Sequence, residues 1–311
     1  MQNVQPLVVV LGTGGTIAGT AASADDNVGY TAAQLGADQL VRAIPALADA
    51  ALEVHQVAQL DSKDMDFATW LALASSVALQ LARPEVAGVV ITHGTDTLEE
   101  TAYFLQRVLA PVKPVVLTAA MRPATALLVD GPQNLLDAVR VAQAAGARGV
   151  VAVMGGEVHS ALDVRKVHTY RIAAFSSGDA GVLAHVEEGV LRRHRAWPGG
   201  TALGLQRLGE DTADWPRVEI VHSHVNAGGG LVRALCADGV QGIVVACTGN
   251  GTLHHALEAE LVQAQTHGVA VLRSSRCLDG AVLGGDNPLP GAGALTPVKA
   301  RIELMLQLMR A

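Results

Sequence analysis

The sequence is poor in several residues that mark common classes of protein. Aromatic residues make up 3% of the chain, and its three cysteines are Cys236, Cys247 and Cys277. An odd number of cysteines without CxxC spacing predicts reduced thiols and no disulfide framework. Charged residues make up only 16% of the chain, the formal net charge is −7, and the nearest approach to a basic run is residues 192–195. These features argue against nucleic acid or an anionic membrane surface as a partner.

Long apolar runs and a secretory leader are also missing. No uncharged apolar stretch approaches the roughly 18 residues that a membrane-spanning helix needs. The first apolar pattern begins at Pro6 or Leu7 without a basic start, a long apolar region or a cleavage site. We therefore expect a cytoplasmic protein with no membrane partner. The 311 residues, of which 50% are hydrophobic, are enough for two domains of unequal size.

Short strand patterns alternate with helical patterns along the chain. Continuously apolar strands such as Val86–Thr92 predict a parallel sheet that is covered on both faces. Residues 192–216 are rich in glycine and proline and interrupt the alternation. We therefore predict an α/β fold: a larger N-terminal catalytic domain with a mostly parallel sheet flanked by helices (residues 1–191), a linker (192–216) and a smaller C-terminal α/β domain (217–311). Strands are expected at 7–11, 54–60, 86–92, 115–117, 149–154, 218–222, 242–246 and 269–272, and helices at 34–50, 67–81, 99–109, 132–145, 230–237, 253–266 and from 297.

Four polar clusters follow the first four predicted strands. They are residues 12–16, 61–64, 93–96 and 119–123. In an open parallel sheet the carboxyl ends of the strands share one edge, where ligands bind. We therefore expect the four clusters to converge on one site.

The first cluster, Gly-Thr-Gly-Gly-Thr at residues 12–16, has three interpretations. It does not match G-x-G-x-x-G, it lacks the lysine of a P-loop, and no helix follows at once to face a phosphate. A plain structural turn is the second interpretation. In the third, the glycines present Thr16 as a nucleophile, and the small residues that follow form a mobile lid.

The third cluster adds a hydroxyl and a carboxylate. Thr97 and Glu100 have the spacing of a capping box at the start of a helix. This leaves Thr95 and Asp96 for other roles, and the pair suits activation of a nucleophile or water together with recognition of a cation.

A hydroxyl nucleophile needs a base. Lys166 and His168 are the candidates in the sequence. A lysine deprived of water beside a carboxylate can act as a base, whereas a surface lysine is a solvated charge, and spacing alone leaves both open. The histidines lack the spacing and the cysteine partners of a zinc site, so we predict no metal.

Together these residues resemble the bacterial-type L-asparaginase family, the amidohydrolases that act on asparagine and often on glutamine. Residues 14–18 (Gly-Gly-Thr-Ile-Ala) are similar to the family's first threonine signature, and residues 92–97 (Thr-His-Gly-Thr-Asp-Thr) to its second. The resemblance covers almost the whole chain, with shorter matches at residues 61–65, 119–123, 130–132, 163–166 and 273–276.

The resemblance implies a role for each matched residue. Thr16 would be the nucleophile that the side-chain amide acylates, assisted by Tyr30. Thr95, Lys166 and Asp96 would form a second catalytic group that activates a hydroxyl or water, and Asp96 would also hold the substrate's α-ammonium group. The resemblance implies that the α-carboxylate is bound by Ser62 and main-chain amides near Gly15 and Gly94, and that the amide and oxyanion are bound by backbone around Thr95 and Ala120.

The sequence departs from the family pattern at three places. Lys63 stands at a substrate-binding position where many members carry Gln or Glu, and a lysine there would repel the ammonium group or turn away. Thr252 replaces an amide side chain, and residues 284–287 lack the glutamate that a neighbouring subunit often supplies. Our hypothesis is that Asp96 alone contacts the ammonium group, with Asp64 or Asp286 compensating.

The expected function is therefore hydrolysis of a linear amide, that of the L-asparagine side chain, to L-aspartate and ammonia through an acyl-enzyme. The resemblance implies no cofactor and a homotetramer of close dimers. A glutaminase-asparaginase of broader specificity is the alternative. Three other functions are rivals to this one. An ammonia-releasing subunit of an amidotransferase is expected to have a basic face, and a non-catalytic amino-acid sensor is expected to lack the nucleophile or the base. The third is a nucleotide-binding domain.

Overall fold

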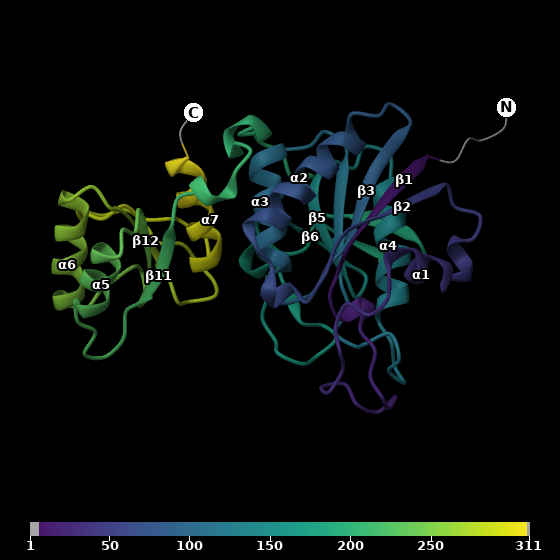
Figure 1. Cartoon of the computed structure of the whole chain (residues 1–311), viewed down its shortest axis with the longest axis horizontal. Helices are drawn as coiled ribbons and strands as arrows, with labels where there is room; N and C mark the ends of the chain where they lie inside the picture. Colours follow the sequence, from purple (N-terminus) through teal and green to yellow (C-terminus); the bar gives the residue numbers. More distant parts are fainter. Residues whose placement is uncertain (1–5, 310–311) are drawn as a thin grey trace. The chain divides into compact units, whose positions relative to one another are not determined.

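The structure is a computed structural model that describes residues 6–309 (Figure 1). It divides into two compact units, Met1–Leu205 and Gln206–Ala311. The division falls inside the glycine- and proline-rich stretch at residues 192–216. No helix in the described part of the chain has the length and apolar character to cross a bilayer.

The larger unit is built on an eight-stranded sheet with the order β10-β9-β6-β5-β4-β3-β1-β2. The five strands from β5 to β2 are parallel to one another, and β6, β9 and β10 each pair antiparallel with their neighbours. The predicted mostly parallel sheet is therefore confirmed, while the three antiparallel strands were not predicted. The strands are β1 (Leu7–Gly14), β2 (Leu52–Leu60), β3 (Val86–Thr92), β4 (Pro114–Thr118), β5 (Gly149–Met154), β6 (Glu157–Ser160), β9 (Ala184–Glu187) and β10 (Val190–Arg193), with a separate ribbon of β7 (Arg165–Lys166) and β8 (Phe175–Ser176).

Helices cover both faces of the parallel part of the sheet (Figure 1). α2 and α3 pack together on one face, whereas α1 and α4 share a core on the other. Because β3 to β4 and β4 to β5 step in the same direction while α3 and α4 lie on opposite faces, the two crossover connections have opposite hands. The helices are α1 (Ala37–Arg42), α2 (Phe67–Leu81), α3 (Leu98–Leu109) and α4 (Gly131–Gln143).

The long helix predicted over residues 34–50 is wrong. α1 covers only six residues, and a 3₁₀ turn, Pro45–Leu47, follows it. Pro45 disfavours a helical conformation in the residue before it, and Ile44 is extended, with φ −109° and ψ 100°. Leu40 and Ile44 still bury their side chains against the sheet, so the apolar stripe indicated the correct face but the wrong length.

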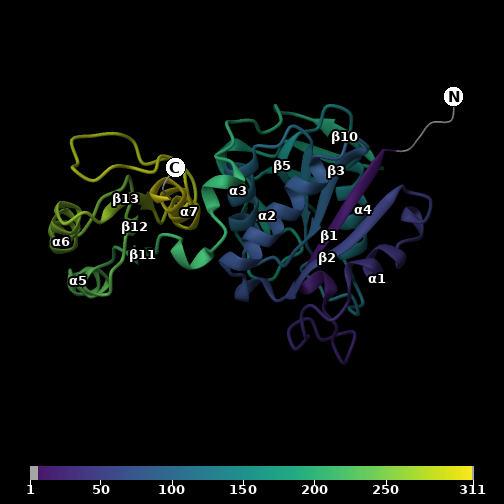
Figure 2. The ribbon, with the colours of Figure 1, turned by 45° about the horizontal axis from the view of Figure 1, so that its top comes forward.

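The smaller unit repeats the layered plan on a smaller scale (Figure 2). Three parallel strands in the order β11-β12-β13 carry α5 and α6 on one face and α7 on the other. Its elements are β11 (Val218–His222), α5 (Gly230–Ala237), β12 (Gly242–Cys247), α6 (His255–Thr266), β13 (Ala270–Ser275) and α7 (Pro297–Leu308).

Candidate active site

The predicted polar clusters meet at one edge of the larger sheet. β2, β1, β3 and β4 are neighbours and parallel, so residues 61–64, 12–16, 93–96 and 119–123 all follow the carboxyl ends of adjacent strands. The chain order 2-1-3-4-5 reverses direction between β1 and β3. A reversal of this kind leaves a crevice at the strand ends, where ligands of doubly wound sheets bind.

Two glycines allow the loops after β1 and β3 to touch at this reversal. A Cβ added to Gly15 would lie 2.4 Å from the Cα and N of Gly94, and one added to Gly94 would lie 2.3 Å from Ser62 Oγ. Gly15 also has φ +82°, which a residue with a side chain rarely adopts. The residues that follow these glycines, Thr16 and Thr95, are both buried. Close backbone contact therefore brings the two threonine segments together.

Thr16 begins a single 3₁₀ turn, Thr16–Ala18, and contacts one residue of the following loop. Its Oγ1 lies 2.7 Å from the hydroxyl of Tyr30, and either group can donate. Two features position Tyr30. Thr20 and Thr31 form a backbone bridge, and the Tyr30 ring packs against Gly19, where an added Cβ would lie 2.9 Å from Tyr30 Cδ2. The loop after the 3₁₀ turn therefore places the phenol group of Tyr30 within hydrogen-bond distance of the Thr16 hydroxyl.

Thr95 has a different partner from a distant part of the chain. Lys166 Nζ donates to Thr95 Oγ1 at 2.9 Å and to Asp96 Oδ1 at 2.6 Å. Lys166 lies on β7, and its backbone N–H donates to Glu99 Oε1 at 3.2 Å at the start of α3. The three side chains form a continuous hydrogen-bonded group in which a proton can move between a hydroxyl, an amine and a carboxylate.

The other candidate base, His168, does not join this group. Its Nδ1 accepts the backbone N–H groups of Tyr170 and Arg171, both at 3.0 Å, and so stabilises a turn after β7. Across residues 6–309, no three His, Cys, Asp or Glu side chains gather in an arrangement that could hold a metal ion.

Ser62 packs directly against the loop after β3. Its Oγ accepts the N–H of Asp96 at 3.2 Å, and its carbonyl accepts the hydroxyl of Thr97 at 2.8 Å. The predicted capping box is therefore wrong in one respect: Thr97 occupies the N-cap position of α3, but its hydroxyl makes no capping bond to the helix. The hydroxyl instead joins the loop after β2 to the loop after β3.

Lys63 pairs with its own neighbours in the chain. Its Nζ lies 2.7 Å from Asp61 Oδ2 and 3.3 Å from Asp64 Oδ2, on an exposed side chain. These carboxylates, Asp61 first, raise the pKa of Lys63. Asp64 therefore already has a cationic partner in Lys63, just as Asp96, whose carboxylate is half exposed, has one in Lys166.

The segment after β4 is fixed by a buried carboxylate. Asp130 accepts the backbone N–H groups of Met121 at 2.8 Å and Arg122 at 3.0 Å, and Asn134 donates to the carbonyl of Ala119 at 2.9 Å. Burial raises the pKa of Asp130 despite these donors. Ala120, between these anchored residues, is completely buried.

A hydrogen-bonded chain behind Gly94 has no counterpart in the sequence prediction. Burial lowers the pKa of His93 to about 4, so the ring is neutral, and because the Gly94 carbonyl only accepts, Nδ1 donates to it at 2.7 Å. Nε2 then accepts the hydroxyl of Thr101 at 3.0 Å, and Thr101 Oγ1 accepts Trp70 Nε1–H at 2.9 Å. The signals available were a histidine ending an apolar strand and a threonine eight residues later on the inner face of a helix.

The sheet order defines a doubly wound α/β domain, and the residues at this edge give it two separate hydroxyl groups, each with its own proton-transfer partner, at the switch point. Family models agree on both parts of the chain: residues 7–198 match "Asparaginase, N-terminal", and residues 217–311 match "Glutaminase/Asparaginase C-terminal domain". The chain belongs to the asparaginase family.

Individual relatives are similar over nearly their full length. L-asparaginase 2 of Escherichia coli is 39% identical over 97% of this chain and 89% of its own length. A glutaminase-asparaginase of Pseudomonas fluorescens is 37% identical over 97% of this chain and 86% of its own. The crystal structure of a probable cytoplasmic L-asparaginase from Campylobacter jejuni superposes with a TM-score of 0.91 and 38% identity, covering 98% of this chain and 95% of that one.

Proposed function

We propose that this protein hydrolyses the side-chain amide of L-asparagine to L-aspartate and ammonia through a covalent intermediate on Thr16. One observation carries the proposal: two buried threonines, on loops in backbone contact, each have their own proton-transfer partner. The names of the relatives support asparagine, and in some cases glutamine, as the substrate.

In the first step, Thr16 Oγ1 attacks the amide carbon of the substrate. The hydroxyl proton passes to the departing nitrogen through the Tyr30 hydroxyl, which accepts it and gives up its own, and the C–N bond breaks to release ammonia. The result is an ester on Thr16. Backbone N–H groups near Thr95 and Ala120 are proposed to stabilise the oxyanion, since fixed donors favour developing charge.

In the second step, water adds to the ester and Thr16 is released with aspartate. We propose that one proton of this water passes through Thr95 and Lys166 to Asp96 as the oxygen adds to the ester carbon. When the bond to Thr16 breaks, the proton of the new carboxyl group returns to Thr16 Oγ1 through the Tyr30 hydroxyl, so the product leaves as a carboxylate, and Asp96 then gives its proton to solvent. Asp96 and Ser62 are proposed to bind the substrate's ammonium and carboxylate groups, with main-chain amides near Gly15 and Gly94. No step needs a cofactor, and Lys63, held by Asp61 and Asp64, is proposed only to border the pocket.

Ammonia release from L-asparagine, L-glutamine and D-asparagine tests the proposal. We expect turnover of L-asparagine that disappears in Thr16→Ala and persists in Thr31→Ala, an exposed threonine on the same loop. The ratio of the glutamine rate to the asparagine rate decides whether the enzyme is the broader glutaminase-asparaginase. Undiminished turnover by Thr16→Ala would refute the assigned nucleophile, and Asp96→Asn with wild-type kcat/KM would refute the assigned ammonium contact.

We further propose that residues 1–191 carry catalysis, that residues 217–311 form the smaller domain, and that four chains assemble as two close dimers. Light scattering on the purified protein tests the assembly. A cytoplasmic location is supported by the description of the C. jejuni protein, although a 38% identical relative from Haemophilus influenzae is described as periplasmic. Cell fractionation decides between the two.

A further inference from the structure

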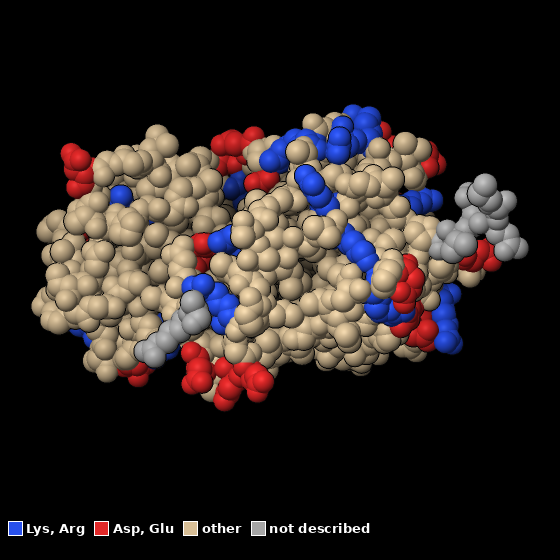
Figure 3. All heavy atoms as spheres, turned by 90° about the horizontal axis from the view of Figure 1, so that it is seen from above, with Lys and Arg blue, Asp and Glu red and all other residues tan. Residues whose placement is uncertain are grey.

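A basic pocket lies at the edge of the eight-stranded sheet opposite the candidate active site. It has a volume of about 370 Å³ and is lined by residues that precede β5 and by residues 193–197, which begin at the last residue of β10. β10 runs antiparallel to β5 through β9 and β6, so the end of β10 and the start of β5 share the amino-terminal edge. Seen from this side, lysine and arginine side chains gather over the larger unit (Figure 3).

Two of the lining arginines have no compensating carboxylate. Arg195 donates to Asp163 Oδ2 at 3.0 Å, and Arg192, which precedes Arg193 in the chain, pairs with Glu187. Arg148 and Arg193 have no such partner among residues 6–309, and no Asp or Glu lines the pocket. In a chain with a net charge of −7, a concave surface with two uncompensated guanidinium groups is a local reversal of charge.

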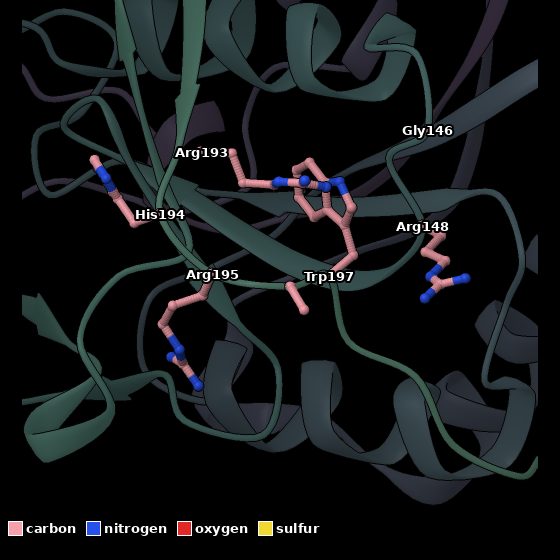
Figure 4. Close-up of a pocket in the computed structure, with 7 residues that line it drawn as sticks. Gly146, Arg148, Arg193, His194, Arg195 and Trp197 are labelled. Carbon is pink, nitrogen blue, oxygen red and sulfur yellow. The ribbon is translucent and has the colours of Figure 1, made fainter.

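The side chains that line the pocket differ in their direction relative to Trp197. Figure 4 shows Arg193 extending across the indole of Trp197 and Arg148 standing to one side of it, whereas His194 and Arg195 point away from the indole. Trp197 is buried and forms part of the lining between the two arginines. The pocket lining therefore combines an indole with two arginines that have no carboxylate partner among the described residues.

The backbone beneath the pocket is held in place before any ligand arrives. A Cβ on Gly149 would lie 2.6 Å from the carbonyl of Pro198, so the strand start and the segment after Trp197 are in direct contact. Gln106 joins them a second time: its Nε2 donates to Gly199 O at 3.2 Å and its Oε1 accepts Val150 N–H at 2.8 Å. The backbone of the site is therefore fixed before a ligand binds, and ordering on binding is confined to the exposed arginine side chains.

We propose that this pocket binds a phosphate group, free or esterified on a small molecule. Guanidinium groups present paired donors that match the oxygens of phosphate, and two uncompensated guanidinium groups match its double negative charge better than the single charge of a carboxylate. The volume exceeds that of the ion alone, which leaves room for an organic substituent beside Trp197. The site is independent of the amide hydrolysis proposed above.

Isothermal titration calorimetry at fixed ionic strength tests the proposal, with inorganic phosphate and glycerol 3-phosphate as the two probes. We expect saturable binding of at least one probe, with a Kd of about 1 mM or tighter. Arg148→Gln and Arg193→Gln should each weaken it at least about tenfold, the loss of a charged hydrogen bond. Tighter binding of glycerol 3-phosphate identifies an organic phosphate ligand, and tighter binding of inorganic phosphate identifies the free ion.

Arg42→Gln is the matched control, because Arg42 is an exposed arginine of the same unit paired only with Asp38 along its helix. It should bind the probes as the wild type does. Absence of saturable heat from both probes would overturn the proposal, and so would equal weakening in Arg42→Gln, which would indicate general attraction to positive charge. Ammonia release by Arg148→Gln and Arg193→Gln in phosphate-free buffer should equal that of the wild type, and this shows that both variants fold.

Discussion

Replacing Gly94 by alanine tests whether backbone contact builds the active site. The new methyl group would lie 2.3 Å from Ser62 Oγ and 2.6 Å from Ser62 Cβ, where ordinary contact begins at 3.4 Å. Ser62 must therefore move by about 1 Å, yet it is buried and bonded to the backbone of Asp96. If Ser62 positions the substrate as proposed, a displacement of this size lowers kcat/KM by roughly a hundredfold. Overpacking of this kind costs about 1–3 kcal/mol of stability.

Kinetics with L-asparagine and urea unfolding measure the two effects separately. Gly199→Ala is the control, because nothing lies within 4 Å of a Cβ there and the residue has no positive φ. The double variant Gly94→Ala/Ser62→Gly removes the clash with Ser62 but also the acceptor of the Asp96 N–H, so we expect it to regain part of the stability and none of the substrate affinity. A Gly94→Ala enzyme with wild-type KM and the urea midpoint of Gly199→Ala would refute the reasoning.

Three further predictions follow from the same structure. Lys166→Met should release about one equivalent of ammonia per site in a burst and then stall, because the group of Thr95, Lys166 and Asp96 is proposed to serve hydrolysis of the ester. Steady turnover at the wild-type rate would contradict that role. His93 binds its proton more weakly when folded, with a pKa of about 4 against 6.5, so its contribution to stability is complete above pH 6.5 and falls by up to about 3 kcal/mol as the pH drops to 4. Urea unfolding of wild type and His93→Gln at pH 7 and pH 4.5 measures this, and identical pH dependence in both would exclude it. A thiol reagent should modify the exposed Cys277 in the native protein. It should modify the buried Cys247 only after unfolding, because burial raises the pKa of that thiol to about 11. Mass spectrometry of the labelled peptides distinguishes the two cysteines.

The parts of the fold that were predictable are those in which burial leaves a repeating pattern. β3 and β5, buried almost throughout, and α2, with Asp66 accepting the N–H of Thr69 at its start, agree with the predicted bounds residue for residue. The antiparallel strands β6, β9 and β10 are four residues each, and β10 is largely exposed. A short strand at the edge of a sheet has no apolar repeat to reveal it, so pattern alone could not place it.

The candidate site was also predictable only in part. Thr16, Thr95 and Ser62 could be expected near one another because each follows a strand of one parallel sheet. Lys166 could not be placed by that argument, since it comes from a two-residue ribbon and meets Thr95 across 71 residues of sequence. Long-range pairing of this kind depends on tertiary packing, and only the resemblance to a family indicated it.

The repeated dipeptide Gly-Thr has a physical explanation in the sheet order. β1 and β3 are hydrogen-bonded neighbours, with Gly12 opposite Thr92, so the residues just beyond them emerge within one strand spacing, about 5 Å. At a switch point the two connections then leave in opposite directions, and β1 turns away through Gly14 and Gly15, which have φ of +101° and +82°. Any side chain at residues 15 or 94 would fill the space between the loops and force the two threonine segments apart. The proposed mechanism, in which two separate proton-transfer pairs act on one substrate, therefore needs glycine before each threonine, a constraint set by strand spacing as much as by chemistry.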